Sequence, residues 1–178
     1  HNFFAGRRSD DAFSDILNDR GLDTNKTEEM VKEFRSEKRK ALKEEFGKYV
    51  FLRKNTKETL EKLKENHNLA LGTSTIKDFT SIFLKNFDIE KHFKVIITAE
   101  NVQKGKPDPE VYLKAAEKLG EKPEDCIVVE DAGNGIEAAK NAGMTCVGIK
   151  DPNFPDKDLS KADYRIKNIE EILCIIKP

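Results

Sequence analysis

Short apolar runs alternate with amphipathic helical patterns through the last two thirds of the chain. The apolar runs predict strands, four of them apolar enough to be buried on both faces of a sheet. These strands cover residues 69–72, 95–98, 126–129, 145–149 and 162–166. The amphipathic patterns predict helices over residues 56–66, 77–86, 109–119, 134–142 and 168–176. This alternation indicates βαβ units, so we expect an α/β fold with a doubly wound parallel sheet.

Residues 9–47 carry the pattern of two amphipathic helices instead. Phe13 and Leu17 lie at helical spacing, and Gly21 ends that segment. A thin apolar stripe then runs from Thr24 to Gly47 among many Glu and Lys residues, which predicts a helix with a solvent-exposed charged face. Residues 150–161, with two prolines, are predicted to form a loop.

Charge and composition exclude several classes of protein. The 178 residues include 32 Lys and Arg against 33 Asp and Glu, which gives a net charge of −1. So small a net charge provides no electrostatic field that would attract nucleic acid or anionic lipid. The apolar runs are far shorter than the ~20 residues of a membrane span. Phe3 and Phe4 precede Arg7 and Arg8, the reverse of the order in a signal peptide. We therefore expect a cytoplasmic protein with no nucleic-acid or membrane partner.

The cysteines and histidines offer no obvious site. All three cysteines have apolar neighbours and lack Cys-x-x-Cys spacing, which predicts buried, reduced thiols. They are Cys126, Cys146 and Cys174. The histidines lie at the terminus or on polar segments, where we expect them to be exposed. They are His1, His67 and His92.

Polar residues follow the predicted strands at the carboxyl ends, where doubly wound sheets bind ligands. The first run ends in Thr73-Ser74-Thr75, and hydroxyl groups at the start of a helix suit a phosphate, although simple helix capping explains them equally well. The second run leads to Gly105-Lys106-Pro107, which holds a lysine at a rigid turn. Such a lysine can serve as a fixed charge for a phosphoryl oxygen or for carboxylates, or it can be an ordinary surface lysine.

Two acids stand directly after the third run. Glu130 and Asp131 repel each other, and such a pair usually has a cation beside it. Capping of the following helix is the alternative, but it does not account for the hydroxyl groups and the lysine at the same edge. Hard oxygen ligands in this company indicate a Mg²⁺-assisted phosphate site.

A dinucleotide-binding turn overlaps these acids. Gly133-Asn-Gly135-Ile-Glu-Ala138 follows a strand, opens a helix and is trailed by Asp151, which superficially satisfies the nucleotide fingerprint. However, Glu130 and Asp131 would face the pyrophosphate that the turn is supposed to cradle. A dinucleotide site is therefore the weaker interpretation.

Three strings together resemble the haloacid dehalogenase-like superfamily, in the branch of β-phosphoglucomutase and small phosphatases with a helical cap. The strings are Leu69-Ala-Leu-Gly-Thr73-Ser74, Val102-Gln-Lys-Gly-Lys106-Pro-Asp-Pro-Glu-Val-Tyr112 and Ile127-Val-Val-Glu130-Asp131-Ala-Gly-Asn-Gly135-Ile-Glu-Ala-Ala-Lys-Asn-Ala-Gly143-Met144. The resemblance covers nearly the whole chain. It implies a helical cap over residues 1–52, incomplete at its N-terminal side, and an α/β core over residues 53–178 that lacks its first strand.

The resemblance also implies roles for the site residues. Thr73 would hydrogen-bond the transferring phosphoryl group, with Ser74 beside it as a phosphate-binding residue. Lys106 would balance charge on the nucleophile and the phosphate. Glu130 with Asp131 would hold Mg²⁺.

One departure from the family pattern is large. The family carries a nucleophilic Asp, and a second Asp two positions later, at the end of an N-terminal strand. No such motif precedes the helical segment here, because Asp10 and Asp11 are adjacent and residues 5–8 are not an apolar run. The family places that strand at the centre of the sheet, between the strands that here end in Gly72 and Val129.

A missing central strand would expose two rows of backbone groups. Each unpaired buried group costs about 1–3 kcal/mol, against a total stability of about 5–15 kcal/mol. We therefore expect that an N-terminal segment, omitted, removed or supplied by another polypeptide, is needed for folding.

In intact form, the expected function is Mg²⁺-dependent phosphotransfer on a small phosphorylated metabolite through an aspartyl phosphate. Arg7 and Arg8 are candidate substrate-binding residues. In the resembling mutases a cap arginine follows a Gly-x-Ser turn, whereas here Gly6-Arg7-Arg8-Ser9 places the arginines ahead of Ser9, which favours a phosphatase over a mutase. The alternative is a catalytically inactive module that binds phosphate and metal.

Overall fold

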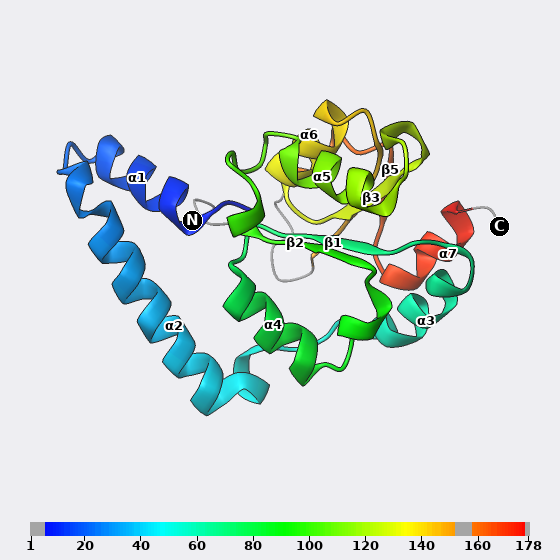
Figure 1. The fold of residues 1–178 in the computed structure, drawn as a ribbon, viewed down its shortest axis with the longest axis horizontal. Coiled ribbons are helices and arrows are strands. Elements are labelled where there is room, and N and C mark those ends of the chain that lie inside the picture. Colours follow the sequence, from blue (N-terminus) through cyan, green and yellow to red (C-terminus); the bar gives the residue numbers. More distant parts are fainter. Residues whose placement is uncertain (1–5, 152–157, 177–178) are drawn as a thin grey trace.

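The computed structural model describes residues 6–151 and 158–176, and it is an α/β structure with helices on both sides of parallel strands (Figure 1). The α-helices are α1 (Ser9–Asp19), α2 (Thr27–Tyr49), α3 (Thr56–Asn66), α4 (Lys77–Asn86), α5 (Glu110–Leu119), α6 (Gly133–Asn141) and α7 (Ile172–Ile175). The strands are β1 (Ala70–Gly72), β2 (Val95–Ile97), β3 (Ile127–Glu130), β4 (Thr145–Ile149) and β5 (Tyr164–Ile166). Short 3₁₀ helices include η2 (Glu90–His92) and η5 (Ile169–Glu171). The predicted fold class is confirmed.

Alternating side chains on the strands divide the core between two helical layers. Cys146 of β4 packs with residues of α5 and α6, whereas its neighbour Val147 packs with Ile172 of α7 on the other face. This alternation follows from the two-residue period of a strand. Figure 1 shows α5 and α6 on one side of the strands, with α4 beyond β1 and β2 on the other.

The strands form two parallel sheets. β1 pairs with β2, and β3, β4 and β5 follow in that order in the second sheet. Among the described residues, β1 and β3 therefore each keep one edge without a strand partner. The backbone of Gly6 passes near the ends of both strands, since its carbonyl accepts a hydrogen bond from Ser74 Oγ and a Cβ added to it would lie 2.8 Å from Ala132.

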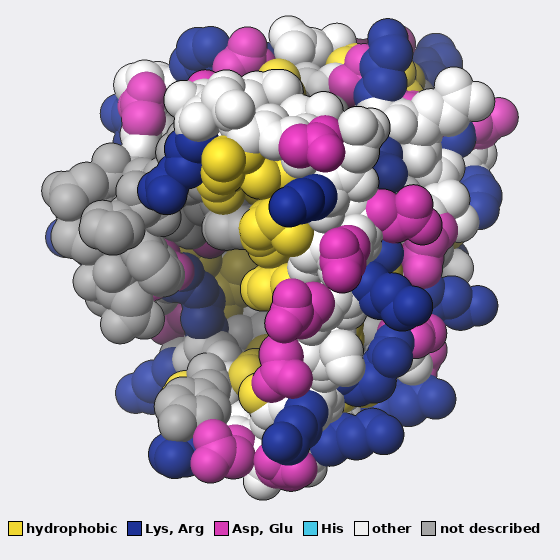
Figure 2. All heavy atoms as spheres, turned by 90° about the vertical axis from the view of Figure 1, so that its left-hand side faces the viewer, with side chains coloured by type: hydrophobic (Ala, Val, Ile, Leu, Met, Phe, Trp, Pro, Cys, Tyr) yellow, Lys and Arg dark blue, Asp and Glu magenta, His cyan; other side chains and the backbone are white. Residues whose placement is uncertain are grey.

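The helices α1 and α2 pack against each other and reach α4. Phe13 of α1 and Phe34 of α2 meet edge to face, with ring centroids 5.6 Å apart. Near the end of α2, Phe46 packs on Phe83 of α4 and on Phe87 directly after it, with ring centroids 5.8 and 5.2 Å apart. Figure 2 shows the face of the molecule on this side, where charges of both signs surround a group of hydrophobic side chains.

Several sequence-based expectations need correction. His92 is 4% exposed, because η2 lies against α3 and α4, so the prediction that it is exposed is wrong. The three cysteines are free, but only Cys146 is buried, whereas Cys126 is half-buried and Cys174 is exposed. The helix expected over 168–176 is shorter and begins as η5.

Two other expectations are only partly covered. The predicted loop at 150–161 falls largely outside the described residues, as do Phe3, Phe4 and His1. No helix in the described part of the chain is long and apolar enough to cross a membrane.

Candidate active site

A cavity of about 640 Å³ lies where α1 and α2 meet the carboxyl ends of β1 and β3. This volume is typical of small-molecule sites. All seven candidate residues of the sequence analysis line it, although they come from four separate parts of the chain. They are Arg7, Arg8, Thr73, Ser74, Lys106, Glu130 and Asp131.

The hydroxyl groups after β1 are partly used in local structure. Thr73 Oγ1 accepts a hydrogen bond from the Thr75 amide at 3.1 Å, and Ser74 Oγ donates to the Gly6 carbonyl at 3.0 Å. These bonds do not cap α4, whose N-cap is Ile76 with no side-chain cap hydrogen bond, so the capping interpretation is wrong. An accepting hydroxyl still has its own proton to donate, so Thr73 can also serve a ligand in the cavity.

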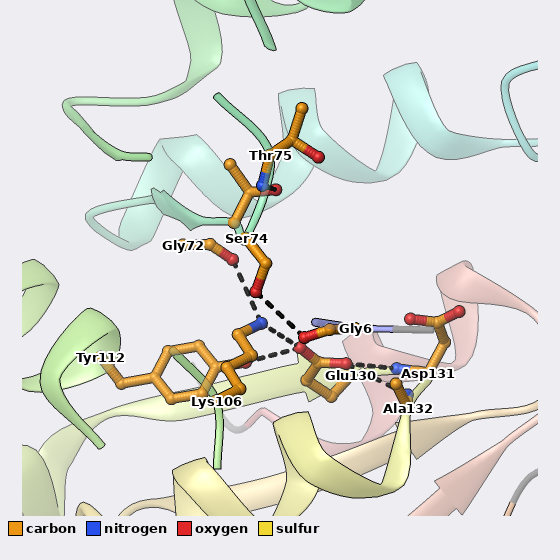
Figure 3. A network of polar contacts seen from close by, with 10 residues as sticks. Gly6, Gly72, Ser74, Thr75, Lys106, Tyr112, Glu130, Asp131 and Ala132 are labelled. Carbon is orange, nitrogen blue, oxygen red and sulfur yellow. Dashed lines mark hydrogen bonds and ion pairs between the residues drawn. The ribbon is translucent and has the colours of Figure 1, made fainter. Parts of the chain in front are cut away.

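Lys106 is buried in a polar network with Glu130 (Figure 3). Its side chain is 5% exposed, and its ammonium contacts Glu130 Oε1, the Gly72 carbonyl at 3.5 Å and the ring of Tyr112 at 4.8 Å from the centroid. The interpretation of Lys106 as a surface turn lysine is therefore wrong. Lys106 links the end of β1 to the end of β3.

Glu130 receives four hydrogen-bond donors. Lys106 and Tyr112 Oη donate to Oε1, the latter at 2.7 Å, and the amides of Asp131 and Ala132 donate to Oε2 at 2.9 and 3.1 Å. Two carboxylate oxygens offer about four lone-pair positions, so this carboxylate is saturated. Gly135 makes room for it, because a Cβ there would lie 2.2 Å from the carboxyl group.

The Asp131 side chain points away from this network in Figure 3 and lines the cavity. Mg²⁺ usually takes one or two protein carboxylates and completes its shell with water and substrate phosphate oxygens. Within the described ranges no group of three or more His, Cys, Asp or Glu side chains could hold a metal. Asp131 could supply one such carboxylate, while Glu130, the other acid predicted to hold Mg²⁺, is engaged by Lys106.

The turn before α6 argues against a dinucleotide. The amides of Asp131 and Ala132 point at the Glu130 carboxylate, which occupies the place where a pyrophosphate would need donors. This negative charge would also repel a pyrophosphate. The arrangement of this turn therefore argues against a dinucleotide site.

The two arginines have partners within the protein. Arg7 pairs with Asp15 on α1, whereas Arg8 donates to the Gln103 carbonyl at 2.9 Å, in the loop that leads to Lys106. Both line the cavity. Arg8 thus ties the start of α1 to the lysine loop.

Glu110 organises the same loop from the first turn of α5. Its carboxylate accepts the amides of Gln103 and Lys104, both at 2.9 Å, and the Lys114 ammonium at 2.7 Å. The Lys104 amide, followed by the ammonium and the second amide, lowers the pKa of Glu110 to about 2.

Sequence reasoning missed several cavity residues. Tyr112 was part of a recognised string but had no assigned role, and its buried hydroxyl bond gives no local sequence signal. The cavity wall formed by α2 and the segment before α3 was also missed, because only the fold brings it opposite Thr73. It includes Phe34, Arg35, Lys38, Phe51 and Arg53.

Comparison with known proteins gives a family match over most of the chain. The profile of the haloacid dehalogenase-like hydrolases matches residues 4–149. The chain is 39% identical over 124 residues to a phosphorylated carbohydrates phosphatase of Thermotoga maritima, covering 68% of this chain and 57% of the relative. It is 38% identical over 85 residues to β-phosphoglucomutase of Bacillus subtilis, covering 48% of this chain and 38% of the relative.

Solved structures agree with the fold. A HAD hydrolase, family IA, variant 3 from Entamoeba histolytica matches with a TM-score of 0.77 and 27% identity, covering 99% of this chain and 82% of that one. The match to the phosphatase and to the β-phosphoglucomutase named above spans less than two thirds of the length of each of these relatives.

Proposed function

This chain belongs to the haloacid dehalogenase-like hydrolase family, in its β-phosphoglucomutase-like branch, and on that basis we propose that it acts in Mg²⁺-dependent phosphoryl transfer from a small phosphate ester. The observation that carries the proposal is the buried lysine network. Lys106 joins the ends of β1 and β3 beside a cavity that Thr73 and Asp131 also line.

Each residue has a distinct role in this proposal. The Thr73 hydroxyl donates to a phosphoryl oxygen, and the Lys106 ammonium offsets the negative charge of the phosphate. Glu130 holds Lys106 in place through a direct ion pair. Asp131 would hold Mg²⁺, which supplies positive charge to the phosphoryl oxygens when it is bound.

The attacking group is proposed to come from outside the described residues. Three acids that line the cavity are held by cations: Asp10 by Arg35, Glu130 by Lys106 and Asp151 by Arg53. The free edges of β1 and β3 among the described residues are consistent with a further strand there.

The proposed nucleophile is an aspartate on that strand. Its oxygen bonds to phosphorus as the ester bond breaks, and the leaving oxygen takes a proton from a second carboxylic acid. Water then cleaves the aspartyl phosphate to inorganic phosphate and restores the carboxylate.

We favour hydrolysis over isomerisation because of the two arginines. A mutase must hold a second phosphate in the distal part of its cavity, whereas Arg7 and Arg8 are already engaged with Asp15 and Gln103. Residues 1–52 are proposed to form the cap over the substrate and residues 53–178 the core. A cavity lined from both parts is consistent with a cap that excludes water during transfer.

The test is hydrolysis of 4-nitrophenyl phosphate across a Mg²⁺ titration, measured on the intact protein that carries the proposed aspartate. Asp131→Ala should abolish Mg²⁺-dependent turnover, at least 100-fold, with an unchanged circular dichroism spectrum. Asp125→Ala is the matched control, because Asp125 lies exposed at the opposite end of β3 and should leave turnover unchanged. If Asp131→Ala turned over as fast as the unchanged protein at saturating Mg²⁺, the proposed role of Asp131 in holding Mg²⁺ would be refuted.

The second candidate is a module that binds phosphate without transferring it. It is favoured by the engagement of Asp10, Glu130 and Asp151 with cations. Calorimetric titration with inorganic phosphate and Mg²⁺ distinguishes the two. Binding that depends on Lys106 without any turnover would identify the module.

A further inference from the structure

We propose that Tyr112 is a positioning residue, whose hydroxyl group holds Glu130 and thereby fixes the Lys106 ammonium at the phosphoryl site. This inference rests on the proposed function for its catalytic meaning. Its geometric part, the placement of Lys106, does not depend on turnover.

The hydroxyl group occupies a specific place in the network (Figure 3). Tyr112 is 6% exposed, and Oη lies 2.7 Å from Glu130 Oε1, the same oxygen that receives Lys106. Burial, together with the negative charge of Glu130, raises the pKa of Tyr112. The phenol therefore stays protonated and donates to the carboxylate.

The ring contributes a second restraint on the lysine. The Lys106 ammonium lies 4.8 Å from the ring centroid, within the range of a cation–π contact. The ring also packs at the end of β1, where a Cβ on Gly72 would lie 3.3 Å from it. Tyr112 thus touches both the lysine and the strand end whose carbonyl the lysine approaches.

These contacts define how the hydroxyl acts. With three other donors alone, the Glu130 carboxylate could rotate or admit water, and its Oε1 would no longer face Lys106 in one fixed direction. A group that must meet a phosphoryl oxygen loses effectiveness when its position is spread over several arrangements. The hydroxyl prevents this without touching the substrate itself.

Tyr112→Phe isolates the hydroxyl, because the phenyl ring keeps the packing on Gly72 and the cation–π contact. Tyr164→Phe is the matched control, since Tyr164 is 51% exposed on β5. The first measurement is pulse acylation of the full chain with acetic anhydride, with Lys106 quantified by mass spectrometry. Exposed Lys161 serves as the internal reference.

We expect Lys106 to be acylated at least fivefold faster in Tyr112→Phe than in the unchanged protein, with Lys161 and the control variant unchanged. Urea titration of each variant shows whether faster acylation follows global unfolding. An unchanged Lys106 rate would overturn the inference, as would an increase shared equally by Lys161.

The second measurement is hydrolysis of 4-nitrophenyl phosphate with Mg²⁺. Loss of one hydrogen bond to a charged group predicts a fall in kcat of about tenfold, with KM changed less than twofold. Unchanged kcat beside faster acylation would refute the catalytic meaning of the contact. No turnover in the intact protein, with the segment that carries the proposed aspartate, would refute the proposed function, while acylation still decides whether Tyr112 positions Lys106.

Discussion

Removing the charge of Glu130 should destabilise the protein more than removing the charge of Lys106. Each oxygen of Glu130 accepts two donors. An amide offers only one oxygen, so in Glu130→Gln the NH₂ group must face either Lys106 and Tyr112 or the two amides at the start of α6. In either orientation the NH₂ group faces other hydrogen-bond donors. The Lys106 ammonium, whose side chain is 5% exposed, also loses its carboxylate partner.

The expected magnitude follows from the burial of the pair. Removing one partner of a buried ion pair costs about 3–5 kcal/mol, a large share of a total stability of about 5–15 kcal/mol. Lys106→Met should cost less, about 1–3 kcal/mol, because Glu130 keeps three donors. In the double variant the oxygen of the introduced amide can face the two backbone amides and its NH₂ group can face Tyr112 Oη, so stability should recover by at least about 1 kcal/mol relative to Glu130→Gln.

The assay is urea unfolding followed by circular dichroism, with the slope of each transition compared between variants. The control is Glu137→Gln with Lys161→Met, because that pair is 3.1 Å apart but 43% and 61% exposed. Its loss should change stability by less than about 1 kcal/mol. A smaller loss for Glu130→Gln than for Lys106→Met, or no recovery in the double variant, would refute the donor argument.

Three further outcomes are expected. Hydrogen-bond donors lower the pKa of Glu110 from its ordinary 4.5 to about 2, so the ionised carboxylate stabilises the fold fully above about pH 4.5 and loses this effect as the pH falls toward 2. In Glu110→Gln the urea midpoint should therefore depend less on pH between about 4.5 and 2, and an unchanged pH dependence would contradict this. In the same assay, Gly135→Ala should lower the free energy of unfolding by about 1–3 kcal/mol, because its Cβ would overlap Glu130. Gly47→Ala, which has open space around it on α2, should raise that free energy by up to about 1 kcal/mol. Equal effects of the two substitutions would show that the overlap with Glu130 relaxes. Burial, together with the negative charge of the nearby Glu130, raises the pKa of the Cys146 thiol to about 12. Iodoacetamide at pH 8 should therefore label the exposed Cys174 and leave Cys146 unmodified in the native protein. Equal labelling of the two cysteines, measured by mass spectrometry, would refute the buried placement of Cys146.

The periodicity of the sequence was sufficient to predict the order of helices and strands. The strand expected over residues 145–149 and the helices expected over 56–66 and 77–86 have those bounds in the structure. Periodicity is a local property, so it locates elements well. Once the strands are parallel, their carboxyl ends share an edge, and this rule alone predicted that Thr73, Lys106 and Asp131 would line one cavity.

Only the tertiary structure decided which side chains meet. Tyr112 and Lys106 lie 18 and 24 residues from Glu130, and no local pattern reveals that both donate to one of its oxygens. His92 has polar neighbours in sequence yet is buried, because α3 and α4 cover η2. Burial and hydrogen bonding depend on the packing of elements far apart in the chain. Only the folded protein therefore reveals that Glu130, predicted with Asp131 to hold Mg²⁺, accepts the buried lysine.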